Sequence, residues 1–141
     1  MRITVICVGK IKEKFYTDAL AEYRKRLSKY CKLEIVELAD EKTKENASAH
    51  EIELVKAKEG ERILSAIKED MYVIALAIEG KMLDSVELSE KIEKLGLSGS
   101  SHVAFVIGGS LGLDSRVYGC AGYERCFVCA PAYYKSLTCR K

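Results

Sequence analysis

The sequence predicts an α/β fold in a single domain over residues 1–141, with a mostly parallel sheet and helices on both faces. Three observations lead to this fold. Short apolar runs, typical of buried strands, alternate along the chain with segments of helical periodicity. The length of 141 residues suits one domain rather than two. Apolar residues make up 48% of the chain and charged residues 31%, a balance that excludes a disordered or collagen-like protein.

The first three elements follow from local patterns. The run from Ile3 to Val8 is β-branched and apolar on both faces and stops at Gly9, which predicts a buried strand. Leu33 to Leu38 predicts a second strand, and residues 39–47 a polar loop. Between the two strands, apolar residues recur in steps of three and four, which predicts an amphipathic helix with its basic residues on the open face. These residues are Phe15, Ala19, Tyr23, Leu27 and Tyr30.

A capping motif predicts where the next helix begins. Ser48 and Glu51 have the spacing of a capping box, in which each side chain accepts a hydrogen bond from the other residue's backbone. Five apolar residues then continue a helical stripe: Ile52, Val55, Ile63, Leu64 and Ile67. Met71 to Ile78 predicts a third strand, buried on both faces and ended by the turn-like residues 79–81.

A third helix and a fourth strand complete the pattern. Ser85 is expected to cap the helix, and Gly96 to close it in the left-handed conformation. His102 to Ile107 predicts the fourth strand, and a glycine-rich segment, residues 108–112, follows it directly. Ligands of parallel sheets sit outside the carboxyl ends of the strands. Because Gly9, Gly80 and residues 108–112 all follow predicted strand ends, the sequence predicts a ligand site along that edge.

The positions of glycines and charged residues limit the kinds of ligand that the protein could bind. The spacing of Gly108, Gly109 and Gly112 lets a backbone approach a ligand, but it matches neither the dinucleotide fingerprint nor the phosphate-binding P-loop. Residues 10–32 hold eight basic and three acidic residues. This excess either forms an ordinary solvated face or a face that binds the phosphates of a nucleic acid.

Other features indicate a soluble cytoplasmic protein. The longest apolar run has eight residues, which is too short to span a membrane, and no signal-peptide pattern opens the chain. Six cysteines without a secretory signal are expected to be reduced. His50 and His102 have no triad spacing and are interpreted as structural. Four cysteines near the end leave a zinc or redox protein as an alternative. They are Cys120, Cys126, Cys129 and Cys139.

Several ordered motifs resemble a known family. They are RITVICVGKIK at residues 2–12, YRKRL at 23–27, EGERIL at 59–64, AIEGK at 77–81 and VAFVIGGSLGL at 103–113. Together they resemble the bacterial ribosomal RNA large subunit methyltransferase H family, a small member of the SPOUT class. The resemblance runs from residue 1 to about 113.

The resemblance implies an enzyme that transfers a methyl group from S-adenosylmethionine to N3 of a pseudouridine in 23S rRNA. It also implies a homodimer, a C-terminal trefoil knot, and neither a metal, a membrane nor DNA as partner. The implied cofactor-binding residues are Leu76, Gly80, Gly108, Gly109, Gly112 and Phe127. The residues expected to hold rRNA phosphates are Lys10, Lys12, Arg24, Lys25 and Arg26. The resemblance assigns no catalytic residue.

From Asp114 onward the sequence departs from the family pattern and ends at Lys141, before the family's usual end. We therefore expect an atypical, shortened C-terminal segment over residues 114–141, which is the part that forms the knot in the family. This departure leaves an alternative function open, in which a catalytically impaired remnant binds RNA without transferring a methyl group.

Overall fold

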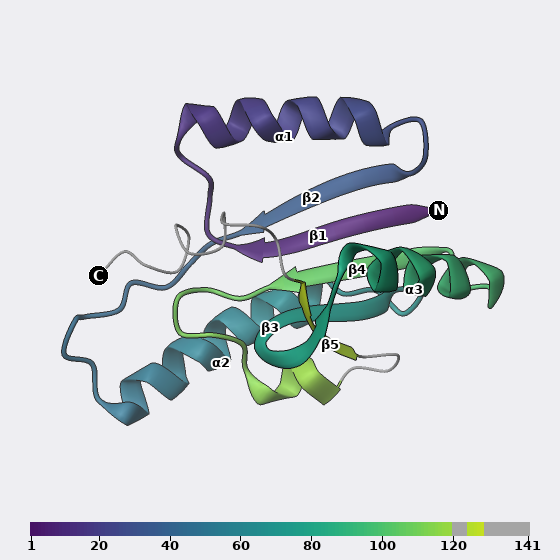
Figure 1. The fold of residues 1–141 in the computed structure, drawn as a ribbon. Helices are drawn as coiled ribbons and strands as arrows, with labels where there is room; N and C mark the ends of the chain where they lie inside the picture. The colour runs from purple at the N-terminus through teal and green to yellow at the C-terminus, as the bar shows by residue number, and fades with distance from the viewer. Residues whose placement is uncertain (120–123, 129–141) are drawn as a thin grey trace.

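The computed structural model describes residues 1–119 and 124–128. Its sheet has five strands in the order β2-β1-β4-β3-β5 (Figure 1). All neighbouring strands are parallel, which confirms the predicted sheet. The carboxyl ends of the strands therefore share one edge, the carboxyl edge. The strands are β1 (Arg2–Val8), β2 (Lys32–Leu38), β3 (Tyr72–Leu83), β4 (His102–Ile107) and β5 (Glu124–Val128).

Helices cover both faces of the sheet, as predicted (Figure 1). On one face lie α2 (Ala49–Ala66) and the short 3₁₀ helix η1 (Ser115–Gly119), and on the other lies α3 (Ser85–Leu97). A further helix, α1 (Lys14–Leu27), lies beside β2, the edge strand. The strands β3 and β4 are therefore the most deeply buried, and the candidate site lies next to them.

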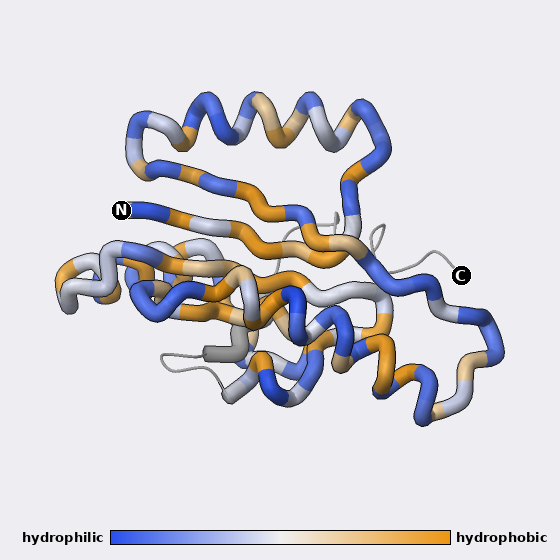
Figure 2. The backbone as a smooth tube through the Cα atoms, turned by 180° about the vertical axis from the view of Figure 1, so that it is seen from behind, coloured by the Kyte–Doolittle hydropathy of each residue, from blue (hydrophilic) through white to orange (hydrophobic). Residues whose placement is uncertain are grey.

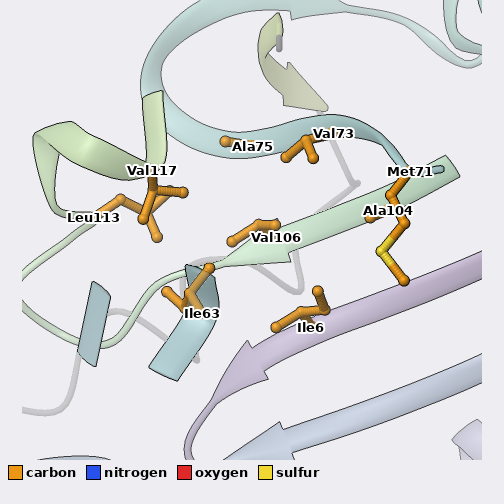
Figure 3. Packing of buried hydrophobic residues seen from close by; sticks show 9 residues of the cluster. All are labelled: Ile6, Ile63, Met71, Val73, Ala75, Ala104, Val106, Leu113 and Val117. Carbon is orange, nitrogen blue, oxygen red and sulfur yellow. The ribbon is translucent and has the colours of Figure 1, made fainter. Parts of the chain in front are cut away.

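The larger core cluster lies between the sheet, α2 and η1 (Figure 3). Its side chains come from β1, β3 and β4 on the sheet and from Ile63 and Val117 on the helices. The cluster consists of Ile6, Ile63, Met71, Val73, Ala75, Ala104, Val106, Leu113 and Val117. A smaller cluster of Ile74, Leu83 and Val103 packs beneath α3. These clusters hold β3 and β4 against α2 and α3.

The predicted capping box at the start of α2 is confirmed. The Ser48 hydroxyl accepts a hydrogen bond from the backbone N–H of Glu51 at 3.2 Å. The Glu51 carboxylate accepts one from the backbone N–H of Ser48 at 2.8 Å, and this bonding lowers the pKa of Glu51. The two contacts satisfy donors that a helix start would otherwise leave unpaired.

Both predicted ends of α3 were wrong by a few residues. Asp84, not Ser85, is the N-cap, and its Oδ1 accepts from the backbone N–H groups of Val86 and Glu87 at 2.8 Å. An ionised carboxylate with two acceptor sites prevails here over a hydroxyl one position later. At the other end, Gly96 lies inside the helix, and Gly99 takes the left-handed conformation with φ of +91°.

The third strand is longer than predicted. Residues 79–81 were expected to end it, but β3 continues to Leu83. The strand continues because β5 pairs with it on both sides of these residues, first at residues 74–76, which also pair with β4, and again at residues 81–83. Both Leu76 and Lys81 face Cys126, so the residues between them form an irregularity of the kind that bulges produce. The turn-like residues thus bend a strand instead of ending it.

The predicted packing of α1 was also wrong. Phe15, Tyr23 and Tyr30 were expected on the buried stripe, but they are 65%, 60% and 80% exposed, and Tyr30 follows the end of the helix. The more protected side chains of α1 are Tyr16, Ala19 and Leu20, a face that includes only one residue of the predicted stripe. Figure 2 shows apolar and polar residues mixed along α1. One edge strand offers too narrow a surface to cover both apolar sides of the helix.

His102 has the structural role that the sequence suggested. It is buried at the start of β4, where its Nε2 lies 2.9 Å from the Thr4 hydroxyl and its Nδ1 2.9 Å from the Asp70 carboxylate. The hydrogen bond to His102 lowers the pKa of Asp70. This chain of contacts ties β1 and β4 together at the end of the sheet opposite the carboxyl edge.

Two helical glycines allow a matched test of the packing between α2 and the chain after β4. A Cβ on Gly60 would lie 2.6 Å from the Cβ of Asp114, whereas one on Gly96 would meet only the terminal methyl of Met1, at 3.2 Å. We expect Gly60→Ala to lower the free energy of unfolding by about 1–2 kcal/mol, since overpacking outweighs the gain in helix propensity. Gly96→Ala should be neutral or stabilising. Urea denaturation measures both, and equal effects would contradict the packing.

Candidate functional site

Residues 108–112 form a tight turn, the glycine turn, at the carboxyl end of β4. The backbone N–H of Gly112 donates to the carbonyl of Gly109 at 3.1 Å, and Gly112 has φ of +87°. A Cβ on Gly108 would lie 2.9 Å from the Leu113 side chain and 3.0 Å from the backbone of Gly112. A turn this close is therefore possible only with glycine at these positions.

Of the predicted cofactor residues outside the turn, Leu76 lies beside it, and Gly80 and Phe127 lie on the neighbouring strands β3 and β5. Leu76 on β3 is the register partner of Ile107 on β4, the residue directly before Gly108. Both side chains are half-buried. Gly80 lies in the irregular part of β3, and Phe127 on β5 is the register partner of Met82. Gly9 and the glycine turn follow the ends of β1 and β4, as predicted, whereas Gly80 lies within β3 and does not follow its end.

Helix α2 supports the glycine turn from beneath through two consecutive buried residues. Gly60 lies against Asp114, and Glu59 lies against Gly109 so closely that a Cβ on Gly109 would be 2.7 Å from the Glu59 Oε2 atom. The other oxygen of Glu59 accepts a hydrogen bond from the backbone N–H of Glu41 at 3.0 Å. Glu59 therefore joins the loop after β2 to the turn after β4.

An ion pair between Asp114 and Arg116 follows the glycine turn. Asp114 Oδ1 accepts from the backbone N–H of Arg116 at 2.8 Å and from its Nε at 3.0 Å. The Arg116 guanidinium also donates to the carbonyl of Ala57 on α2 at 2.9 Å. These hydrogen bonds to Arg116 hold the pKa of Asp114 below its ordinary value. The pair fixes the start of η1 onto α2, and with it the exit of the turn.

The predicted RNA-binding residues are exposed, but they do not form one cluster. Lys10 and Lys12 precede α1 and extend from the carboxyl end of β1, while residues 24–26 occupy the last turn of the helix. With 14 residues, α1 is about 20 Å long, so the two groups are separated by the length of the helix (Figure 1). Arg26 pairs with Glu22 at 2.8 Å. Lys10 and Lys12 lie on the side of the glycine turn.

A shallow cleft of about 390 Å³ lies close to the site but apart from the glycine turn. It runs along α2 and η1, and its charged lining includes Glu53, Glu61 and Asp114 together with Arg116. His50, which the sequence suggested to be structural, also lines it. Because acidic side chains outnumber the arginine, this cleft is poorly suited to the phosphates of RNA.

The zinc alternative lies mostly outside the described residues. Cys120, Cys129 and Cys139 are not among them, and Cys126 is placed only by its backbone on β5. Within residues 1–119, Cys7 and Cys31 are free thiols, and burial raises the pKa of Cys7. In the described part of the chain, no group of three potential metal ligands comes together.

Comparison with known proteins identifies the family. A sequence model of the family described as "Predicted SPOUT methyltransferase" matches residues 1–127. This chain belongs to the SPOUT methyltransferase family. The match runs to residue 127, so the departure from the family expected at Asp114 was placed too early, and it covers all of β5 except Val128.

Individual relatives agree with this assignment. The chain is 56% identical over 127 residues to the ribosomal RNA large subunit methyltransferase H of Clostridium acetobutylicum, a match covering 90% of this chain and 80% of that protein. It is 58% identical over 127 residues, with the same coverage, to the protein of that name from Clostridium novyi. A third, from Bifidobacterium adolescentis, is 59% identical over 123 residues, covering 87% of this chain and 77% of its own length.

The structure agrees with the family in its general architecture. It is a parallel α/β sheet whose glycine turn follows a central strand. The predicted knot depends on residues outside the described ranges. In the described part of the chain, no helix is both long and apolar enough to cross a membrane.

Sequence reasoning missed two residues of the site, Glu59 and Arg116. The signal for Glu59 was present, because Val55, Glu59 and Ile63 follow one another in steps of four along α2. A carboxylate in an apolar stripe indicates a buried polar group with a specific partner. Arg116 carried no comparable signal, since its contacts arise only once η1 folds onto α2.

The ion pair at the exit of the turn predicts a pH dependence. Because the folded protein holds the pKa of Asp114 below the reference value of 3.8, its stabilisation is complete above that pH and is lost as the pH falls below it. We expect Asp114→Asn to lower the free energy of unfolding at pH 7, and the difference from wild type to shrink towards pH 2.

Urea denaturation across this pH range measures the effect. Asp18→Asn, a change of the same charge on the exposed surface of α1, serves as control and should alter stability by less than about 0.5 kcal/mol. A difference between wild type and Asp114→Asn that stays constant with pH would contradict the role of the Arg116 pair.

Proposed function

We propose that this chain transfers a methyl group from S-adenosylmethionine to N3 of a pseudouridine in 23S rRNA. The observation that carries the proposal is the glycine turn at the carboxyl edge, with Leu76 of β3 beside it, in a chain that belongs to the SPOUT methyltransferase family. The names of the relatives, which are ribosomal RNA large subunit methyltransferases, support rRNA as the substrate.

The residues at the carboxyl edge fit such a cofactor. Leu76 and Ile107 are half-buried register partners and offer apolar surface to the adenine ring. The glycine turn beside them exposes backbone at Ser110 and Gly112, which suits the polar groups of the ribose and the amino acid. When bound, S-adenosylmethionine would supply a methyl group on a cationic sulfur for transfer to N3, whose proton would pass to water.

The protein's own contribution is chiefly one of position. A rigid turn held by α2 fixes where the cofactor binds, so that the acceptor nitrogen needs only to be brought into line. Lys10 and Lys12 are exposed at the same edge and would hold rRNA phosphates, which orients the substrate without reading its sequence. The basic residues at 24–26 would contact RNA farther from the reacting base.

A homodimer is part of this proposal. The exposed apolar side chains of α1, among them Phe15 and Tyr23, form a surface that a second copy of the chain would cover. In the same way, the cytoplasm is the proposed location, because the ribosomal substrate is assembled there.

The proposal is tested by methyl transfer. Ribosomal particles that lack the modification are incubated with the protein and labelled S-adenosylmethionine, and mass spectrometry of nuclease fragments locates the methyl group. We expect one methylated pseudouridine in 23S rRNA. Binding of the cofactor and of RNA without any transfer would overturn the proposal in favour of a remnant that only binds RNA.

A variant in the glycine turn ties this activity to the site. Gly108→Ala places a methyl group 2.9 Å from Leu113 and must distort the turn, so we expect cofactor affinity to fall at least about tenfold while the protein stays folded. Gly119→Ala, whose Cβ would have no atom of the described residues within 4 Å, is the control. Titration calorimetry measures both, and an unchanged affinity of the Gly108 variant would place the cofactor elsewhere.

The RNA contact predicts a salt dependence. Replacing Lys10 and Lys12 with alanine should weaken RNA binding and reduce the slope of log affinity against log salt by about 1.4, with cofactor affinity unchanged. The control replaces Lys68 and Lys94, two exposed lysines away from the carboxyl edge. Equal loss of RNA affinity in the two double variants would contradict a specific role for Lys10 and Lys12.

A further inference from the structure

The Glu59 carboxylate is buried and only half satisfied. The residue is 5% exposed, and its Oε1 accepts the hydrogen bond from the backbone of Glu41. Its Oε2 atom is fully buried and has no hydrogen-bond partner among the residues that the structure describes. Burial of an unpaired carboxylate oxygen is costly, and such an atom in a folded protein calls for an explanation.

Two arginines of α2 and η1, Arg62 and Arg116, pair with carboxylates other than Glu59. Arg62 pairs with Glu41 and donates to the carbonyl of Ala39 at 2.7 Å. Arg116 pairs with Asp114. Glu59 forms no ion pair with another described residue. Because its carboxylate is buried, it is weakly screened by water and interacts strongly with nearby charges.

The free oxygen is aimed at the glycine turn. It lies 2.7 Å from the position that a Cβ on Gly109 would occupy, so only the thickness of the Gly109 backbone separates it from the far side of the turn. Under the proposed function, that far side holds a cofactor whose sulfur is positively charged. After methyl transfer the same sulfur is neutral, while the rest of the molecule keeps its charges.

We propose that Glu59 is a specificity-determining residue of the cofactor site, whose buried carboxylate beneath Gly109 favours the cationic sulfonium cofactor over its neutral-sulfur product. The inference rests on the proposed function, because it requires the cofactor to lie on the glycine turn. Its consequence is that the product leaves more readily than the cofactor, since the attraction to Glu59 ends with the transfer.

The experiment compares the affinities of the intact protein for S-adenosylmethionine and S-adenosylhomocysteine by titration calorimetry. Glu59→Gln preserves the shape of the side chain and removes its charge. We expect it to lower the affinity for S-adenosylmethionine about tenfold and that for S-adenosylhomocysteine less than about twofold. Glu53→Gln, the same change at an exposed position of α2, is the control and should leave both affinities unchanged.

The ratio of the two affinities separates the outcomes. If Glu59→Gln weakens both ligands equally, Glu59 only supports the turn and the inference is overturned. If it changes neither, the inference is overturned as well while the proposed function stands. If the wild-type protein binds neither ligand, the proposed function fails, and the inference fails with it.

A second variant keeps the test valid if Glu59→Gln does not fold. Glu59→Asp retains the charge but moves it one methylene away from Gly109. We expect the ratio of S-adenosylmethionine affinity to S-adenosylhomocysteine affinity to be lower than in the wild type, because the charge lies farther from the sulfur. A ratio in Glu59→Asp equal to that of the wild type would overturn the inference.

Discussion

The candidate site depends on the close approach of α2 to the chain that follows β4. At Gly60 the helix comes so near to Asp114 that any side chain would clash, and one residue earlier Glu59 presses against Gly109. Because neither glycine carries a Cβ, backbone and side chain can meet where two ordinary residues would be held apart. This contact fixes the glycine turn relative to the sheet, and the position of the proposed cofactor site follows from it.

The rest of the architecture brings the other residues to the same place. A fully parallel sheet directs the strand ends to one edge, so Leu76 on β3 lies beside Gly108 after β4, although the two are far apart in the sequence. The irregularity of β3, which contains Gly80, lies between two stretches of the strand that both pair with β5. The Asp114–Arg116 pair then secures the exit of the turn onto α2.

Much of this could be predicted from local patterns, and the failures have physical causes. The buried strands and the cap of α2 are encoded within a few residues, and these predictions were confirmed. The apolar face of α1 was wrong because periodicity does not reveal how much sheet lies beneath a helix, and β2 is an edge strand. The end of β3 was wrong because the turn-like residues 79–81 fall in an irregularity of the strand, which pairs with β5 again from Lys81. Glu59 was missed because its meaning depends on Gly109, which is fifty residues away.

The central claim is that the cofactor binds on the glycine turn, and NMR of the ¹⁵N-labelled protein tests it most directly. Glycine amides occupy a distinct region of the spectrum, so each can be followed while S-adenosylmethionine is added. The account predicts large shifts for Gly108, Gly109 and Gly112, and none for Gly99, which lies between α3 and the start of β4. Saturation of the protein with cofactor while the amides of the glycine turn stay unshifted would contradict the account.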